Sequence, residues 1–61
     1  MDELEQELER WSGVKALIIK IARDFVGNPT DAQLRIELRT LLQKEESCRK
    51  KVESAALKRY L

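Results

Sequence analysis

Apolar residues recur every three or four positions over two long stretches of the chain, separated by one short break. In each stretch the spacing alternates between four and three, with one charged residue among the apolar ones. This alternation is typical of a helix that buries one stripe against a partner helix, as in a coiled coil. The predicted core positions are Leu4, Leu8, Trp11, Lys15, Ile18, Ala22 and Phe25 in the first stretch, and Leu34, Leu38, Leu41, Glu45, Cys48, Val52 and Ala55 in the second.

The break between the stretches is the one turn signal in the sequence. Gly27 suits a left-handed helix C-cap, and Pro29 cannot continue a helix. Thr30 with Gln33 has the form of a capping box, so a second helix should begin near Asp31. Asp2 and Glu5 offer a similar, weaker start for the first helix. The predicted organisation is a single domain over 1–61, with a helix over about 3–26, a turn at 27–30 and a helix over about 31–59.

Folding the chain at this turn pairs the two stripes layer by layer, from Phe25 with Leu34 to Leu4 with Ala55. The single charged position of each stripe then falls in the same layer, where Lys15 meets Glu45. We expect this pair to set the register of the hairpin more than its stability, because buried ion pairs often gain little net free energy. The predicted fold class is all-α, an antiparallel helical hairpin with a coiled-coil-like seam.

The charge distribution agrees with this topology. Net charge is only +1, so its placement matters more than its sum. Residues 2–9 carry five acids and no base, whereas residues 49–59 carry five bases and one acid. An antiparallel hairpin brings these two segments together. It also places acids at a helix N-terminus and bases at a helix C-terminus, which the helix dipole favours.

One seam does not use all the apolar residues. A 61-residue domain buries little surface and usually needs a disulfide, a metal or a partner. The chain has one Cys and no His, which leaves a partner. We expect a homodimer that forms a four-helix bundle, or alternatively docking on a different helical protein. The residues expected at this interface are Val14, Leu17, Ile21, Leu42 and Tyr60.

Catalytic and metal-binding patterns are nearly absent. Ser12 with Lys15 and Ser47 with Lys50 match the Ser-x-x-Lys spacing of some serine nucleophiles, but four-residue patterns recur by chance. No Gly-rich phosphate loop or multiple-Cys set is present. The sequence therefore predicts a small non-enzymatic interaction or regulatory module that self-associates or docks on a helical protein partner, with no cofactor, metal or small-molecule substrate.

Features of the sequence also bear on location. The run Ala16–Ile19 is interrupted by Lys20, which is far short of a membrane span. The start Met1-Asp2-Glu3 is acidic where a signal peptide would be basic, and Met1 suggests a natural start. We expect a soluble protein without membrane association, in the cytoplasm or another reducing compartment, with Cys48 as a small core residue.

One broad face of the second helix favours an alternative function. At about 100° per residue it lies opposite the seam and is expected to hold no acid. Lysine, serine, threonine and glutamine contact phosphates and sugar hydroxyls without reading bases, which suits double-stranded RNA. A polar outer face is equally what a bundle helix shows to water. The candidate nucleic-acid residues are Gln33, Thr40, Lys44, Ser47, Lys50, Lys51, Ser54 and Lys58, with Gln43 on the same face.

No motif identifies a family, but the general plan resembles three groups of short helical proteins. The Rop family of plasmid RNA-binding regulators and the insect-nodavirus silencing suppressors are helical dimers that bind RNA. Type III secretion needle co-chaperones are two-helix proteins whose Leu-Glu-rich start is similar to Leu4-Glu5-Gln6-Glu7-Leu8. These resemblances are architectural and transfer no functional residue.

Overall fold

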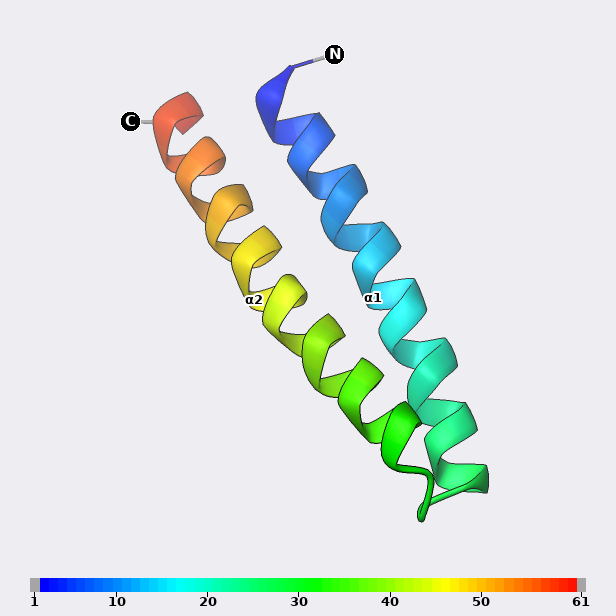
Figure 1. The fold of residues 1–61 in the computed structure, drawn as a ribbon. Coiled ribbons are helices and arrows are strands. Elements are labelled where there is room, and N and C mark those ends of the chain that lie inside the picture. Colours follow the sequence, from blue (N-terminus) through cyan, green and yellow to red (C-terminus); the bar gives the residue numbers. More distant parts are fainter. Residues whose placement is uncertain (1, 61) are drawn as a thin grey trace.

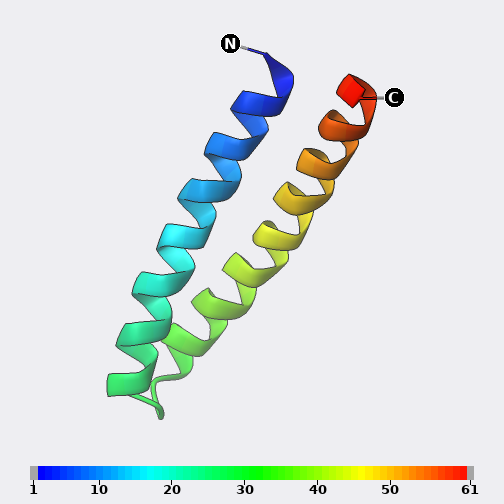
Figure 2. The same cartoon turned by 180° about the vertical axis from the view of Figure 1, so that it is seen from behind.

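A computed structural model describes residues 2–60 of the chain. Two helices make up this part: α1 spans Glu3–Gly27 and α2 spans Ala32–Tyr60. They pack against each other in antiparallel order, so the two ends of the chain lie together (Figures 1 and 2). The hairpin measures 46 × 16 × 12 Å and is a single layer of helices. The predicted all-α hairpin is confirmed, and each helix boundary lies within one residue of its predicted place.

Helix α1 begins and ends with side-chain caps. The Asp2 carboxylate accepts a hydrogen bond from the Glu5 N–H at 2.8 Å, as expected for an N-cap. The helix then runs unbroken through Gly13. At its end the Asn28 backbone N–H donates to the Phe25 carbonyl at 3.0 Å, and the Asn28 side-chain Nδ2 donates to the Asp24 carbonyl at 3.3 Å. The predicted left-handed cap at Gly27 is wrong: this residue is the last of the helix, and neither glycine has a positive φ.

Helix α2 begins next to the predicted position but with a different capping residue. Asp31 Oδ1 accepts hydrogen bonds from the N–H groups of Gln33 at 2.9 Å and Leu34 at 3.2 Å. The predicted capping box had Thr30 in this role. Aspartate caps at least as well as threonine, and the Asp31 N–H also closes the turn on the Asn28 carbonyl at 3.0 Å. The turn and the cap therefore meet in one residue.

The seam of α2 is the predicted one. All of its expected core positions are buried or half-buried, and Ala55, at 5% exposure, is the only fully buried residue among residues 2–60. No helix in this range is long and apolar enough to cross a membrane. The half-buried positions of α2 include Leu34, Leu38, Leu41, Glu45, Cys48 and Val52.

The seam of α1 differs from the predicted one at two positions. Leu8 and Lys15 are exposed, whereas Glu7 and Val14 are half-buried in their place. A helix has 3.6 residues per turn, so a stripe can follow either of two neighbouring positions in each turn. Turning α1 toward Val14 spares the structure the cost of burying a lysine ammonium. The same rotation turns the side chain of Glu7 inward.

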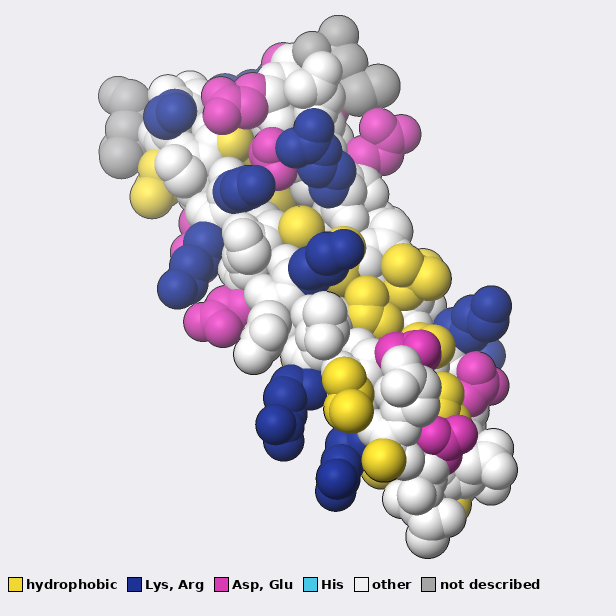
Figure 3. All heavy atoms as spheres, in the orientation of Figure 1, with side chains coloured by type: hydrophobic (Ala, Val, Ile, Leu, Met, Phe, Trp, Pro, Cys, Tyr) yellow, Lys and Arg dark blue, Asp and Glu magenta, His cyan; other side chains and the backbone are white. Residues whose placement is uncertain are grey.

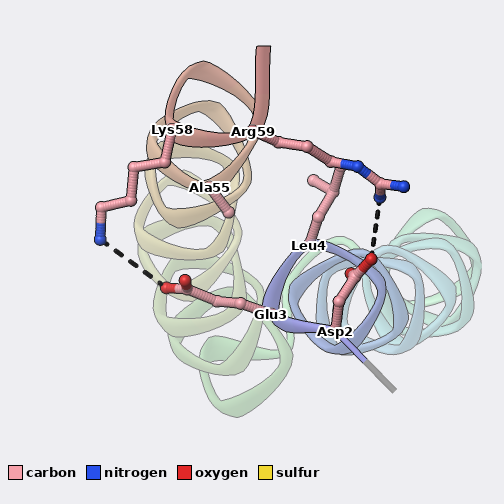
Figure 4. Close-up of a pocket in the computed structure, with 6 residues that line it drawn as sticks. All are labelled: Asp2, Glu3, Leu4, Ala55, Lys58 and Arg59. Atoms are coloured by element: carbon pink, nitrogen blue, oxygen red, sulfur yellow. Dashed lines mark hydrogen bonds and ion pairs between the residues drawn. The ribbon is translucent and has the colours of Figure 1, made fainter. Parts of the chain in front are cut away.

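The free ends of the hairpin are joined by charge. The Arg59 guanidinium donates to the Asp2 carboxylate at 2.9 Å, and the Lys58 ammonium lies 4.0 Å from the Glu3 carboxylate. Figure 4 shows both pairs reaching from α2 to the start of α1, with Leu4 between them. The predicted meeting of an acidic and a basic segment is thus present in the structure.

Candidate interaction site

The hairpin presents two different surfaces, one on each side of its plane. On one side a shallow hollow is lined by Leu17, Ile21, Gln33, Ile36, Glu37, Thr40 and Leu41. On the other side lie two hollows that share Ile19 as a lining residue. One is also lined by Lys15, Ile18, Leu42 and Glu45. The other is also lined by Ala22, Arg23 and Val26. These two hollows have no lining residue in common with the first. The seam residues between the helices separate the two surfaces.

We call the second surface the apolar face. On α1, Leu8 and Ile19 are spaced by about three helical turns, and Ile19 and Val26 by about two, so their side chains share one direction. On α2, Tyr60 follows Leu42 by about five turns. These residues are large and exposed: Val26 is 79% and Tyr60 75% accessible to solvent. The apolar face consists of Leu8, Ile19, Ala22, Val26, Leu42 and Tyr60.

We call the first surface the lysine face. Close to the turn it holds Leu17 and Ile36, which line one hollow with Thr40. Farther along α2, exposed lysines follow at intervals of seven residues, or about two turns. The side of the hairpin shown in Figure 3 has this mixed character, with hydrophobic side chains between the helices and Lys and Arg over α2. The lysine face consists of Leu17, Gln33, Ile36, Thr40, Lys44, Ser47, Lys51 and Lys58.

Trp11, halfway along the hairpin, contacts two side chains of opposite charge. Its indole N–H donates to Glu45 Oε1 across the seam at 3.1 Å. The Lys15 ammonium lies 3.9 Å from the centre of the same ring, within cation–π range. The two charged side chains line one hollow of the apolar face, together with Ile19 and Leu42.

The predicted direct pair of Lys15 with Glu45 differs from this arrangement. Within residues 2–60 no ion pair joins them, because the indole of Trp11 takes the carboxylate oxygen and its ring face takes the ammonium. Lys15 is exposed and Glu45 is half-buried. Both charges remain at the middle of the molecule, but each retains capacity to bind another partner.

The five residues predicted for the oligomer interface do not form one surface. Val14 and Ile21 are half-buried at the hairpin seam. Leu17 is exposed on the lysine face, whereas Leu42 and Tyr60 are exposed on the apolar face.

Ile19 and Val26 are not among the predicted core or interface residues, and Leu8 is predicted in the core. A signal for them was present, since Ser12, Ile19 and Val26 repeat every seven residues on α1. This stripe lies beside the heptad of Leu8 and Lys15. Two adjacent heptad stripes widen the apolar surface of a helix, so that it can pack against a second neighbour besides its partner in the hairpin.

The predicted nucleic-acid residues are all exposed, but they do not share one acid-free surface. Lys50 pairs with Glu46 at 3.6 Å, and Lys58 lies 4.0 Å from Glu3 of the other helix. Glu37, half-buried, accepts a hydrogen bond from Gln33 Nε2 at 3.4 Å. The acid-free face was predicted for the second helix alone. In the folded hairpin, Glu3 of α1 and Glu37 and Glu46 at the edges of this face approach its residues.

By helical geometry, Lys50, Gln43 and Ser54 lie on the outer side of α2, away from α1. The serines of the two Ser-x-x-Lys matches, Ser12 and Ser47, are both exposed on helix surfaces. No group of metal-ligating side chains occurs in the described range. The chain matches no protein-family model, no curated protein and no solved structure.

Proposed function

We propose that the hairpin is a non-enzymatic interaction module, of a regulatory type, that docks through its apolar face on another helical surface. The observation that carries the proposal is that five of the eight large exposed apolar side chains within residues 2–60 lie on one side of a thin molecule, whereas Leu17, Ile36 and Leu57 lie elsewhere. Ile19 is 53% and Leu42 49% accessible, in addition to the more exposed Val26 and Tyr60. Large exposed apolar residues gathered on one side, with charged residues such as Lys15 and Arg23 among them, are typical of protein–protein contact sites.

The energetics of the isolated hairpin support the same proposal. The interior is a single seam in which only Ala55 is fully buried within residues 2–60. The seam also contains Glu7, whose Oε2 is buried without a hydrogen-bond partner in that range. Leaving a buried acceptor unpaired costs about 1–3 kcal/mol. Because the hairpin has so little interior, burying its outer apolar residues against a partner would add substantially to the free energy of unfolding.

Site-specific photo-crosslinking in cells that express the chain tests this proposal. A benzoylphenylalanine at position 19 lies in the apolar face, and one at position 43 lies on the outer side of α2 as the matched control. We expect a discrete crosslinked band from position 19 and none from position 43. A lack of bands from position 19, or equal bands from both positions, would overturn the proposal.

Binding of double-stranded RNA is the second candidate function, favoured by one observation. Lys44 and Lys51 point from the lysine face and form no ion pair within residues 2–60. They stand about 10 Å apart along the helix, with Ser47 between them. Ammonium and hydroxyl groups so spaced suit contacts to phosphates and 2′-hydroxyls.

A titration against a fluorescent duplex RNA of about 20 base pairs, at low and physiological salt, tests the second candidate. Duplex DNA and single-stranded RNA serve as controls. Salt-sensitive binding that prefers duplex RNA supports it, and an absence of binding at low salt excludes it.

For either function, we propose a location in the cytoplasm or another reducing intracellular compartment.

A further inference from the structure

We propose that a second copy of this chain covers the apolar face, in a dimer whose two-fold axis runs along the hairpin, so that both turns lie at the same end. In this four-helix arrangement α1 of each copy packs on α2 of the other. The inference rests on the proposed function and adds the partner and its orientation.

The surface area of the hairpin favours a partner the size of a second copy. The chain exposes 4830 Å². A compact monomer of 7.1 kDa is expected to expose about 4,100 Å². The excess of about 700 Å² is close to the roughly 800 Å² that each partner contributes to a standard stable interface. One copy of the same elongated face supplies a surface of matching length and width.

The charges in the apolar face decide how two copies fit together. Lys15 stands at the middle of α1, and Glu45 stands one residue from the middle of α2. Both line one hollow, and both are held in place by Trp11. A two-fold interface brings the same patch of both copies together, so these two charges meet charges of the second copy near the centre of the dimer.

Two face-to-face arrangements are open to such a patch, and they differ in charge. If the turns lie at opposite ends, α1 packs on α1, and Lys15 meets Lys15 of the second copy. If the turns lie at the same end, α1 packs on α2, and Lys15 meets Glu45 of the second copy twice by symmetry. Like charges opposed across an interface are unfavourable, and opposite charges set register and orientation.

The apolar residues and the helix ends favour the same orientation. With the turns together, residues at equal height face each other across the interface, so Ile19 comes opposite Leu42 of the second copy. The acidic N-terminal end of α1 and the basic C-terminal end of α2 of the second copy also come to the same end of the dimer. With the turns apart, the acidic end of α1 faces the end of another α1, where Arg23 and Asp24 offset each other.

Solution mass and one inter-copy distance test the inference. A spin label is placed on Thr30→Cys in the turn, in a Cys48→Ser chain whose mass and helicity match those of the unaltered chain. We expect a dimer in light scattering. The two labels should lie within roughly 25 Å, because neighbouring helix axes lie about 10 Å apart. With the turns at opposite ends, the separation would approach the 46 Å length of the hairpin.

A mixed experiment controls for label placement. Copies labelled at Thr30→Cys are combined with copies labelled at Glu5→Cys, near the free end of α1. The inter-copy distance should now be long, and it would be short if the turns were apart. A dimer with these two results reversed overturns the orientation, and a monomer at all concentrations overturns the dimer. In the latter case, a crosslink from position 19 to a chain of different mass would leave the proposed interaction function standing.

Discussion

The apolar face and the lysine face flank the same seam, yet they differ in how far their hydrophobic residues extend. On the apolar face, exposed apolar residues run from Leu8 and Tyr60 at the free end to Val26 beside the turn. On the lysine face they are confined to the neighbourhood of Leu17 and Ile36 close to the turn, and lysines occupy the rest. The apolar face thus carries more exposed apolar residues over a greater length than the lysine face, although Lys15 on α1 and Arg49 on α2 interrupt it.

The largest effect should come from placing a charge in the apolar face. We expect Ile19→Glu combined with Leu42→Glu to weaken self-association by about a hundredfold or more, because two desolvated carboxylates would replace apolar contacts in each copy. Sedimentation equilibrium measures the change. Leu17→Glu on the lysine face is the matched control and should leave the dimer intact. If the control dissociates the dimer equally, the assignment of the two faces is wrong.

A smaller effect should follow from reversing one central charge. Lys15→Glu should weaken the dimer about tenfold, since it opposes two carboxylates where an opposite pair stood. Adding Glu45→Lys to the same chain should restore most of the affinity, as measured by dilution calorimetry. A dimer with its turns at opposite ends would not respond in this way, because like charges already face each other there. Unchanged affinity in the single variant therefore argues against the same-end orientation.

A substitution in the seam should change the stability of the hairpin and leave self-association through the apolar face unchanged. Glu7 is half-buried with an unpaired Oε2, while the adjacent Leu8 is exposed on the apolar face. We expect Glu7→Leu to raise the free energy of unfolding by about 1 kcal/mol, because it removes a buried acceptor without a partner. Urea denaturation measures this, and Glu9→Leu at an exposed position is the control. Glu7 Oε1 accepts a hydrogen bond from Arg10 at 3.3 Å, so a loss of stability in Glu7→Leu would show that this pair contributes more than the unpaired Oε2 costs.

The smallest effect on stability should come from the lysine face. Lys44→Gln combined with Lys51→Gln should change the free energy of unfolding by less than about 0.5 kcal/mol, as is usual for exposed substitutions. The dimer should be unaffected. If the chain binds duplex RNA, the same variant should weaken binding to every sequence and lower the salt slope by about two units. RNA binding with an unchanged slope would place the contact elsewhere.

Much of the fold could be predicted from the sequence because its signals are local. The turn around Pro29, the acidic cap at Asp2 and the three–four spacing each act within a few residues. The structure has the turn and the cap, and it follows the predicted spacing throughout α2 but departs from it at Leu8 and Lys15 of α1. The complete α2 seam was predicted for the same reason. The acidic and basic ends also paired as expected, since helix direction alone brings Asp2 near Arg59.

The candidate site was predicted less well. Its residues depend on the rotation of α1 about its own axis, and periodicity allows two rotations that differ at Leu8 and Lys15. The structure has the rotation that buries Val14 and exposes Leu8. That choice moves the exposed apolar surface to Ile19 and Val26, which pattern analysis of the first helix had left unassigned.

Local signals in the amino-acid sequence account for the two helices, their turn, their antiparallel order and the surplus of apolar residues over one seam. These follow from hydrogen-bonding caps and from spacing along a helix, which are properties of neighbouring residues. Three further features are visible only in the folded hairpin: which of its sides is apolar, the position of Trp11 between Lys15 and Glu45, and the approach of carboxylates to the lysines. These features depend on how two helices turn against each other, and that rotation is set by the packing and desolvation of the whole seam at once.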